Sequence, residues 1–436
     1  MIASWAAVAA AAALSSSALS SSAPSSSAPS SSVPSLHEPL QGVDARATGG
    51  DDDVDNNDSV TSPTDLMLNA GVGHGVSIKA VDGSFEFQAR ARLHLRAQAT
   101  VDDDADDEEA ALRPELFVRR ARIVFGGRVL HDLFQWQVQL GLAPNDVEKD
   151  LPIIVRDAYV TWNGPLHLGV RVGQMKVPFD RQRLTSSSAQ QLTERSRVVN
   201  ELNLDRDIGA QLIHSHLLGD TVAVQLGVFG GDGRNRPVAT PSMLSVARVQ
   251  LSPLGAFDDL VEGDVARSAE PRLAVAVAAA YNVNTTRSRS THGDVVDVSA
   301  GGGIDYAHAT ADAVFKWHGV SAMVSGLARV ALADGGSDVA VARSAAGGVA
   351  QVGVFVVDGL ELVGRGSVTV PLDVTTWDGA ANEASFAASG EQWEGTVGTN
   401  FFFSGHNLKL QLDAGLVGDE VERPDFQARS QLQLFF

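Results

Sequence analysis

The sequence predicts an all-β chain, a 16-stranded antiparallel transmembrane β-barrel with short periplasmic turns and long extracellular loops. Three observations predict it: long strands that alternate apolar and polar residues, connections that alternate in length, and a terminal phenylalanine in an apolar row. The chain has 436 residues and no cysteine, which excludes disulfides and thiolate metal sites. Its net charge of −20 argues against any general affinity for nucleic acid.

The clearest strand is FEFQARARLHLRAQAT, at residues 85–100. Every second residue from Phe85 to Ala99 is apolar, and the opposite row contains Arg90, Arg92 and Arg96. Because successive side chains of a strand point to opposite faces, this segment has one apolar face and one basic face. It is much longer than the roughly five or six residues of a strand in a soluble sheet. A wall between lipid and a wet lumen would require both properties.

The same alternation recurs along the chain and defines sixteen expected strands. They are 83–100, 115–126, 131–143, 153–162, 165–175, 206–217, 220–230, 242–252, 271–283, 303–317, 319–332, 345–357, 359–370, 392–403, 406–417 and 425–436. The odd connections between them are mostly long and polar, and the even ones are mostly tight, with 253–270 as the exception. An up-and-down barrel with outer loops and periplasmic turns produces this parity, whereas a soluble sandwich has no reason to show it.

The residues before the barrel are predicted to form an export signal followed by a flexible linker. Residues 1–23 are predicted to be a signal peptide, because an apolar alanine-rich run precedes small residues that could be cleaved. Residues 24–80, rich in Ser, Pro and Asp, are expected to be a disordered linker, and residues 81–436 the barrel. The acidic run at 102–109 is expected in an exposed loop, where it either is simply solvated or binds divalent cations that bridge lipopolysaccharide.

The last strand ends in FQARSQLQLFF, with Phe436 in the same apolar row as Phe426 and Leu434. A final strand of this kind looks like the signal by which the assembly machinery recognises outer-membrane barrels. We therefore expect Phe436 to be the assembly signal, and the barrel-assembly machinery and outer-membrane lipids to be partners. The expected location is the outer membrane of a Gram-negative-type bacterium.

From about residue 83 to 436 the sequence resembles the phosphate-selective porins of the O and P type. The motifs that carry the resemblance include FVRRARIVFGGRV at 117–129, VGQMKVPFD at 172–180, DRDIGAQL at 205–212 and GTNFFFSGHNLKLQLD at 398–413. Their joint order and spacing is specific. The resemblance implies a sixteen-stranded homotrimeric porin for small anions, with phosphate or polyphosphate as the leading solute, although the solute varies within the family.

Basic residues on the polar faces are the candidates for an anion path, because a planar guanidinium donates two hydrogen bonds to one phosphate or carboxylate. They are Arg90, Arg92, Arg96, Arg120, Arg122 and Arg171. On a regular strand Arg119 and Arg120 cannot both point inward, and Arg120 gives the better outer row. Two interpretations stay open: the arginines attract anions, or they pair with lumenal acids such as Glu86, Asp157 and Asp413.

The third long connection, 176–205, is expected to fold inward and form the constriction, as it does in porins of this size; an outer loop at the trimer edge is the alternative. Its candidate residues are Lys176, Arg181, Arg183, Arg195 and Arg197. No GxSxG, P-loop or HExxH motif is present, so we expect no enzyme activity, catalytic residue, metal or cofactor. The predicted function is passive diffusion of small anions; a general non-selective porin and a non-conducting anchor barrel are the alternatives.

Overall fold

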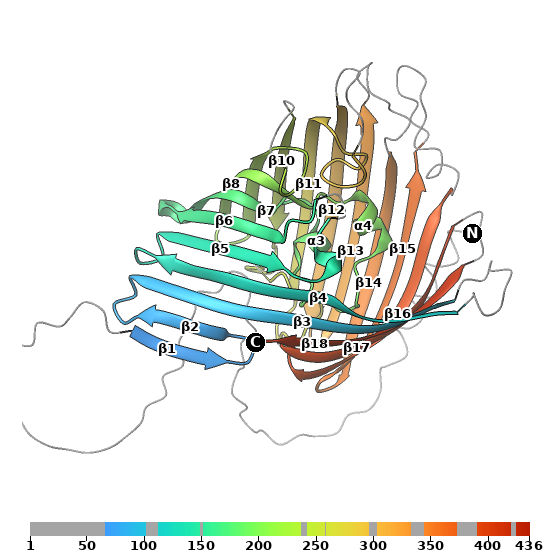
Figure 1. Ribbon diagram of the computed structural model, residues 1–436, viewed down its shortest axis with the longest axis horizontal. Coiled ribbons are helices and arrows are strands. Elements are labelled where there is room, and N and C mark those ends of the chain that lie inside the picture. Colours follow the sequence, from blue (N-terminus) through green and yellow to red (C-terminus); the bar gives the residue numbers. More distant parts are fainter. Residues whose placement is uncertain are drawn as a thin grey trace, which may run out of the picture. The chain divides into compact units, whose positions relative to one another are not determined.

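The computed structural model describes residues 66–101, 112–148, 151–236, 242–257, 259–295, 303–332, 344–372, 390–419 and 424–436. The expected signal peptide, most of the expected linker and the acidic run at 102–109 lie outside these residues. The described chain is mostly β-structure (Figure 1). In the part of the chain that is described, no helix has the length and apolar character needed to cross a membrane.

Sixteen strands form a closed antiparallel barrel. They are β3 (Phe85–Val101), β4 (Leu112–Val129), β5 (Phe134–Gly141), β6 (Val155–Asn163), β7 (Leu168–Lys176), β8 (Arg206–Leu217), β9 (Val222–Phe229), β10 (Met243–Leu251), β11 (Arg272–Thr285), β12 (Ile304–Trp317), β13 (Val320–Leu332), β14 (Ala345–Val357), β15 (Leu360–Pro371), β16 (Gln392–Ser404), β17 (Leu408–Gly418) and β18 (Asp425–Phe435). Each strand pairs with the next, and β18 pairs with β3 to close the barrel. The predicted fold class is therefore confirmed, and each expected strand is present with ends shifted by a few residues.

In β3 the polar side chains and the apolar side chains lie on opposite sides of the barrel wall. Arg92, His94 and Arg96 are buried, whereas Phe85 and Leu95 are exposed on the outside. This arrangement reverses that of a soluble sheet, because lipid rather than a protein core contacts the apolar row. The polar row therefore faces the lumen.

A β-bulge in β4 corrects one expectation from the sequence. His94 pairs with Arg120 and Leu95 pairs with Val118, so Arg119 is an extra residue without a partner in the β3–β4 ladder. The register shift lets Arg119 and Arg120 both reach Glu194, with N–O distances of 2.5 and 3.2 Å. The expectation that only one of the two arginines can point inward is wrong, because the strand is irregular at this point.

Two further strands lie within the segment expected to be linker. β1 (Leu66–Gly71) and β2 (Gly75–Ala80) form a hairpin, and β2 pairs with β3. The turn between them uses Gly73 and Gly75, whose φ angles of +79° and +68° suit glycine. The last part of the expected linker is therefore structured, because a short alternating hairpin was concealed by the polar composition of the residues before it.

Candidate functional site in the lumen

The connection between β7 and β8, residues 177–205, lies inside the barrel and is called loop 3 below (Figure 1). It contains two short helices, α3 (Arg181–Leu184) and α4 (Arg197–Leu202). The side chain of Ser196 caps α4 by accepting a hydrogen bond from the Val199 amide. Val198 and Leu202 are buried in one apolar cluster with Val349 of β14. This apolar contact holds α4 against the inner surface of the wall.

Polar contacts fix loop 3 to the far side of the barrel. The Thr193 amide donates to Asp413 Oδ2 at 2.9 Å, and the Arg197 amide donates to Glu394 Oε2 at 2.8 Å. Lys409 Nζ donates to the Gln190 carbonyl at 2.6 Å. Loop 3 therefore crosses the lumen from β7 and β8 to β16 and β17.

Glu194 is the main contact between loop 3 and the basic wall. Its carboxylate accepts from Arg96 at 2.6 Å as well as from Arg119 and Arg120. Burial alone would raise the pKa of Glu194, but Arg120, Arg119 and Arg96 together hold that pKa well below its usual range. The carboxylate is therefore ionised, and it neutralises only part of the charge around it.

Deeper in the lumen, predicted candidates from β3 and β4 converge on loop 3. Arg92 Nη1 donates to Ser186 Oγ at 3.0 Å, and Arg122 Nη1 donates to Ser187 Oγ at 3.1 Å. Arg122 also pairs with Asp146 at 2.6 Å, in the short helix η2 (Pro144–Asp146). These two serines and Asp146 were not identified from the sequence, because no local pattern places them beside β3 and β4.

Several buried donors in this region have no partner within the described residues. They are Arg92 Nε, Arg120 Nη1 and the protonated ring nitrogen of His94, neither of whose ring nitrogens has a recorded partner. All three residues are less than 9 % exposed. A buried N–H without a partner is costly, and an anion or water of suitable size would satisfy it. We call Arg92, His94, Arg120 and Arg122 the basic cluster.

The other two wall candidates, Arg90 and Arg171, have no recorded bond to loop 3 among the described residues. Arg90 lies over the ring of Phe435, with its Cζ 5.8 Å from the ring centroid. Arg171 Nε donates to Thr161 Oγ1 at 2.9 Å, and its guanidinium lies 4.5 Å from the Tyr159 ring centroid. Four of the six predicted wall arginines thus contact loop 3 or its neighbours, and Arg90 and Arg171 contact aromatic rings, as Arg92 also does at 4.9 Å from the Phe435 centroid.

The predicted cations at the end of β7 and in loop 3 mainly bind backbone carbonyls. Lys176 Nζ donates to the carbonyls of Leu184 and Thr185, and Arg195 donates to the carbonyls of Gln182 and Thr185. These bonds satisfy the carbonyl end of α3, which has no helical partners of its own. Within the described ranges, Lys176 and Arg195 are therefore stabilised by peptide carbonyls and have no recorded bond to a carboxylate.

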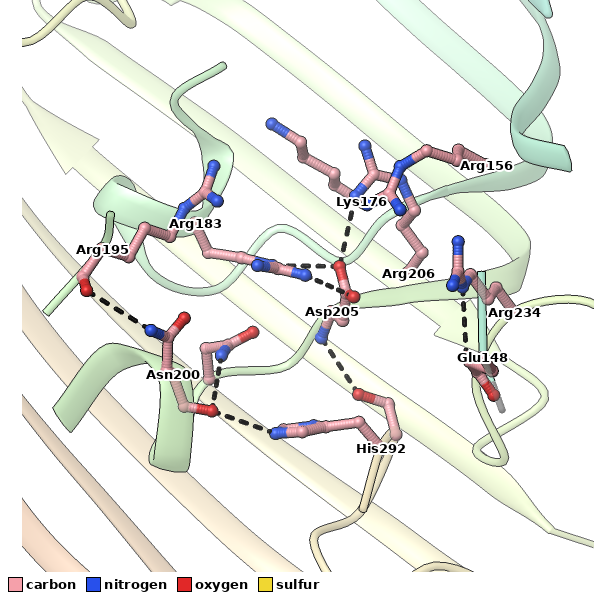
Figure 2. A network of polar contacts seen from close by, with 12 residues as sticks. Glu148, Arg156, Lys176, Arg183, Arg195, Asn200, Asp205, Arg206, Arg234 and His292 are labelled. Carbon is pink, nitrogen blue, oxygen red and sulfur yellow. Dashed lines mark hydrogen bonds and ion pairs between the residues drawn. The ribbon is translucent and has the colours of Figure 1, made fainter. Parts of the chain in front are cut away.

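The acid partners of the network come from several connections (Figure 2). Asp205 pairs with Arg183 and with Arg206, and Arg206 also pairs with Asp157 at 2.9 Å. Glu148 accepts from Arg234 at 3.1 Å, which links two outer connections. The predicted pairing of Asp157 thus occurs, but with an arginine of β8 rather than with one of the six candidates.

A polar cavity of about 510 Å³ opens between loop 3 and the outer halves of the wall strands. Its charged lining residues are Arg96, Arg119, Arg195, Arg197, Arg365, Arg429, Glu194, Glu394 and Asp425. Six arginines thus face three acids. Arg197 is the one predicted loop cation whose side chain lines this cavity without contacting a carbonyl or carboxylate recorded for the described residues. Arg365 and Arg429 were not identified from the sequence.

A second connection enters the lumen from the periplasmic end. This segment, residues 252–271 between β10 and β11, is the exception to the parity of connection lengths and is called the inner segment. The Glu262 amide donates to the Ala189 carbonyl at 2.8 Å, and Glu262 Oε2 accepts from the Gln191 amide at 2.9 Å. Lys316 of β12 donates to Asp259 at 2.5 Å. Loop 3 therefore contacts a second inserted segment as well as the wall.

Phe257 and Arg181 complete the contact between the inner segment and loop 3. Phe257 is 3 % exposed and packs with Ala274 and Val314. Arg181 lies over the Phe257 ring at 5.0 Å and donates to the Asp259 carbonyl. The sequence indicated only that this connection is long, since its partners lie far away along the chain.

No cluster of three or more His, Asp or Glu side chains in the described ranges is arranged to hold a metal ion. His214 and His216 lie on β8, and His216 Nδ1 lies 2.7 Å from Asp220 Oδ1 on the exposed surface. This geometry fits ordinary strand and turn residues.

Comparison with known proteins agrees with this architecture. The family model for phosphate-selective porin O and P matches residues 87–310. No curated protein sequence matches the chain. Among solved structures, an OmpF complex with daunomycin from Salmonella typhi has a TM-score of 0.54 at 12 % identity, covering 82 % of this chain and 100 % of that one.

Two more solved structures give the same result. The anion-selective porin from Comamonas acidovorans has a TM-score of 0.52 at 11 % identity, covering 81 % of this chain and 100 % of that one. The outer-membrane channel DcaP of Acinetobacter baumannii has a TM-score of 0.52 at 11 % identity, covering 82 % and 99 %. At these identities the similarity shows a common fold.

Proposed function

The chain belongs to the phosphate-selective porin O and P family and is an outer-membrane channel, and from this premise we propose that its solutes are small anions. Phosphate or polyphosphate is the leading solute. The basic cluster carries the proposal. Its unpartnered N–H groups on Arg92, His94 and Arg120 point to a ligand that accepts several hydrogen bonds at once. Oxyanions accept charge-assisted bonds from guanidinium groups and would satisfy these donors.

The cavity of about 510 Å³ supports the proposal from the outer side. Its lining has more cations than acids, so an anion entering from outside would first meet a positive field. The net charge of −20 does not oppose this, because fields in physiological salt extend only about 8 Å and only charges near the path act on a solute. Arg195 and Arg197 then serve as constriction-loop residues at the inner edge of this cavity.

We further propose a homotrimer. The outer wall formed by β3, β4 and β14–β18 has a concave, mainly apolar hollow of about 1310 Å³, lined by residues such as Leu116, Val352 and Val397. A second barrel packed here would remove this apolar surface from lipid and fill the hollow. Phe436 follows β18 and is 48 % exposed on the outer face beside β3, where an assembly factor could contact it before subunits associate.

Planar-bilayer recordings test the anion proposal. Under a potassium chloride gradient, the reversal potential of the wild type should show preference for chloride, and added phosphate should block chloride current. Arg120→Ala should shift the reversal potential toward potassium and weaken the phosphate block. Arg171→Ala is the matched control, because Arg171 lies on a wall strand but contacts Tyr159 instead of the basic cluster. A wild type that prefers potassium would refute the proposal.

One observation favours a second function, a non-conducting anchor barrel. Loop 3 and the inner segment contact each other within the lumen through Glu262, Ala189 and Gln191. A non-conducting barrel would require these two segments together to close every path for a solute. Absence of conductance steps from correctly folded protein in a planar bilayer would support the anchor, whereas steps that occur in threes would support the trimeric channel.

A further inference from the structure

The β1–β2 hairpin continues the barrel wall beyond the end of β18. Along one edge of β3, β18 pairs with Arg92–Val101 and β2 pairs with Glu86–Ala89, while β4 occupies the other edge. The Gly73 amide donates to the Phe435 carbonyl at 3.0 Å, and the Phe436 amide donates to the Ala91 carbonyl at 2.9 Å. The hairpin therefore begins along β3 where the C-terminal strand stops.

The hairpin keeps the two-faced pattern of the wall. Ile78 pairs with Phe87 of β3 and with Leu68 of β1, and directly paired residues of antiparallel strands share one face. The outer apolar row of β3 therefore continues across both hairpin strands. On the opposite face, Ser77 pairs with Gln88 and with Asn69. Leu68, on the apolar face, is 71 % exposed.

The apolar face lies beside an aromatic group on the outer wall. The Phe87 ring lies 6.2 Å from the Phe125 ring and 6.0 Å from the Trp136 ring. These three residues lie on β3, β4 and β5 near the turn that joins β4 and β5 at the periplasmic end. Belts of aromatic residues at this position mark the boundary between lipid and water in barrels.

We propose that the β1–β2 hairpin is part of the lipid-contacting wall, with its outer row inserted at the headgroup–acyl boundary of the periplasmic leaflet. The partner is phospholipid, which suits an exposed apolar row in continuity with lipid-facing β3. The opposite row, with Asn69 and Ser77, contacts water. The hairpin thereby shields the backbone of β3 below the C-terminus and attaches the start of the barrel to the membrane surface. The inference holds whatever solute the channel carries.

Single-cysteine labelling tests the proposal cleanly because the chain has no cysteine of its own. Leu68→Cys and Asn69→Cys are neighbouring positions on opposite faces of β1. Each full-length variant is nitroxide-labelled and reconstituted into phosphatidylethanolamine–phosphatidylglycerol vesicles, and its accessibility to oxygen and to a water-soluble nickel chelate is measured by electron paramagnetic resonance. Val324→Cys, on the exposed outer face of β13, provides the lipid reference.

We expect the label at position 68 to match that at 324, with more access to oxygen than to nickel, and the label at 69 to show the reverse. Equal nickel access at 68 and 69 would place the hairpin in water and overturn the proposal. Shielding of position 68 from both reagents would mean that protein covers the row, which also overturns it. Ile78→Cys repeats the test on β2, and heat-dependent gel mobility verifies that each variant forms a barrel.

Discussion

Loop 3 and the inner segment enter the same lumen from opposite ends, and they use their charges differently. Glu194 of loop 3 binds three arginines of the wall, and the loop's Arg197 lines the outer cavity. The inner segment contributes acids, and Asp259 and Glu262 bind Lys316 and the loop backbone. The cationic lining is therefore concentrated on the outer side of loop 3, whereas the inner segment mainly holds loop 3 in position.

The largest expected effect comes from removing the inner segment from the lumen. Replacing residues 257–264 by a Gly–Ser linker of equal length should raise single-channel conductance about two-fold or more, because conductance depends on the width of the constriction. The reversal potential should keep its sign, since the basic cluster is untouched. Unchanged conductance in a folded variant would show that the inner segment does not narrow the path.

Glu194→Gln tests the outer half of the comparison. Removing this carboxylate leaves Arg96, Arg119 and Arg120 without their shared partner, and breaking a buried ion pair from one side costs about 3–5 kcal/mol. We expect a lower unfolding temperature in detergent together with a stronger preference for chloride. Asp220→Asn is the control, because its pair with His216 is exposed and such pairs contribute about 0–1 kcal/mol. Equal losses in both variants would contradict the role given to Glu194.

Glu262→Ala tests the contact between the two segments. It removes the acceptor for the Gln191 amide and for Gln351 Nε2, while the backbone bond from the Glu262 amide to Ala189 can remain. Hydrogen bonds to charged groups contribute about 1.5–3 kcal/mol, so the contact should loosen without being lost. Open-channel current noise should increase with a small rise in conductance. Glu270→Ala, at an exposed position of the same segment, should change neither quantity.

The smallest expected effect is a pH dependence carried by Glu194. Its pKa in the folded protein is lowered from an unfolded value near 4.5, so its stabilising contribution is complete above that pH and is lost as pH falls through the lower, folded pKa. The unfolding temperature of the wild type should therefore decrease on acidification, and Glu194→Gln should decrease less. Parallel curves for the two proteins between neutral pH and about pH 2 would contradict this assignment.

The strands were predictable from the sequence because lipid and water impose opposite demands on successive residues. Arg92 and Arg96 show this directly, since their row could face only the lumen. The contacts of Glu194 were not predictable, because its partner Arg96 lies 98 residues away and the two meet only where loop 3 crosses the lumen. The β1–β2 hairpin was missed because each strand has only six residues, too few to outweigh the polar composition of the preceding segment.

The bulge at Arg119 reverses which residues of β4 face outward, the even-numbered or the odd-numbered ones. Before it, even-numbered Leu116 and Val118 lie on the outer face, and after it odd-numbered Ala121 and Ile123 do. Deleting Arg119 would join the two parts of β4 into one regular strand with every other side chain on its present face. Deleting a residue of β4 other than Arg119 or Arg120 would instead move the bulge or turn a run of side chains to the opposite face. The Arg119–Arg120 pair is thus the place in β4 where one residue can be lost without changing which side chains contact lipid.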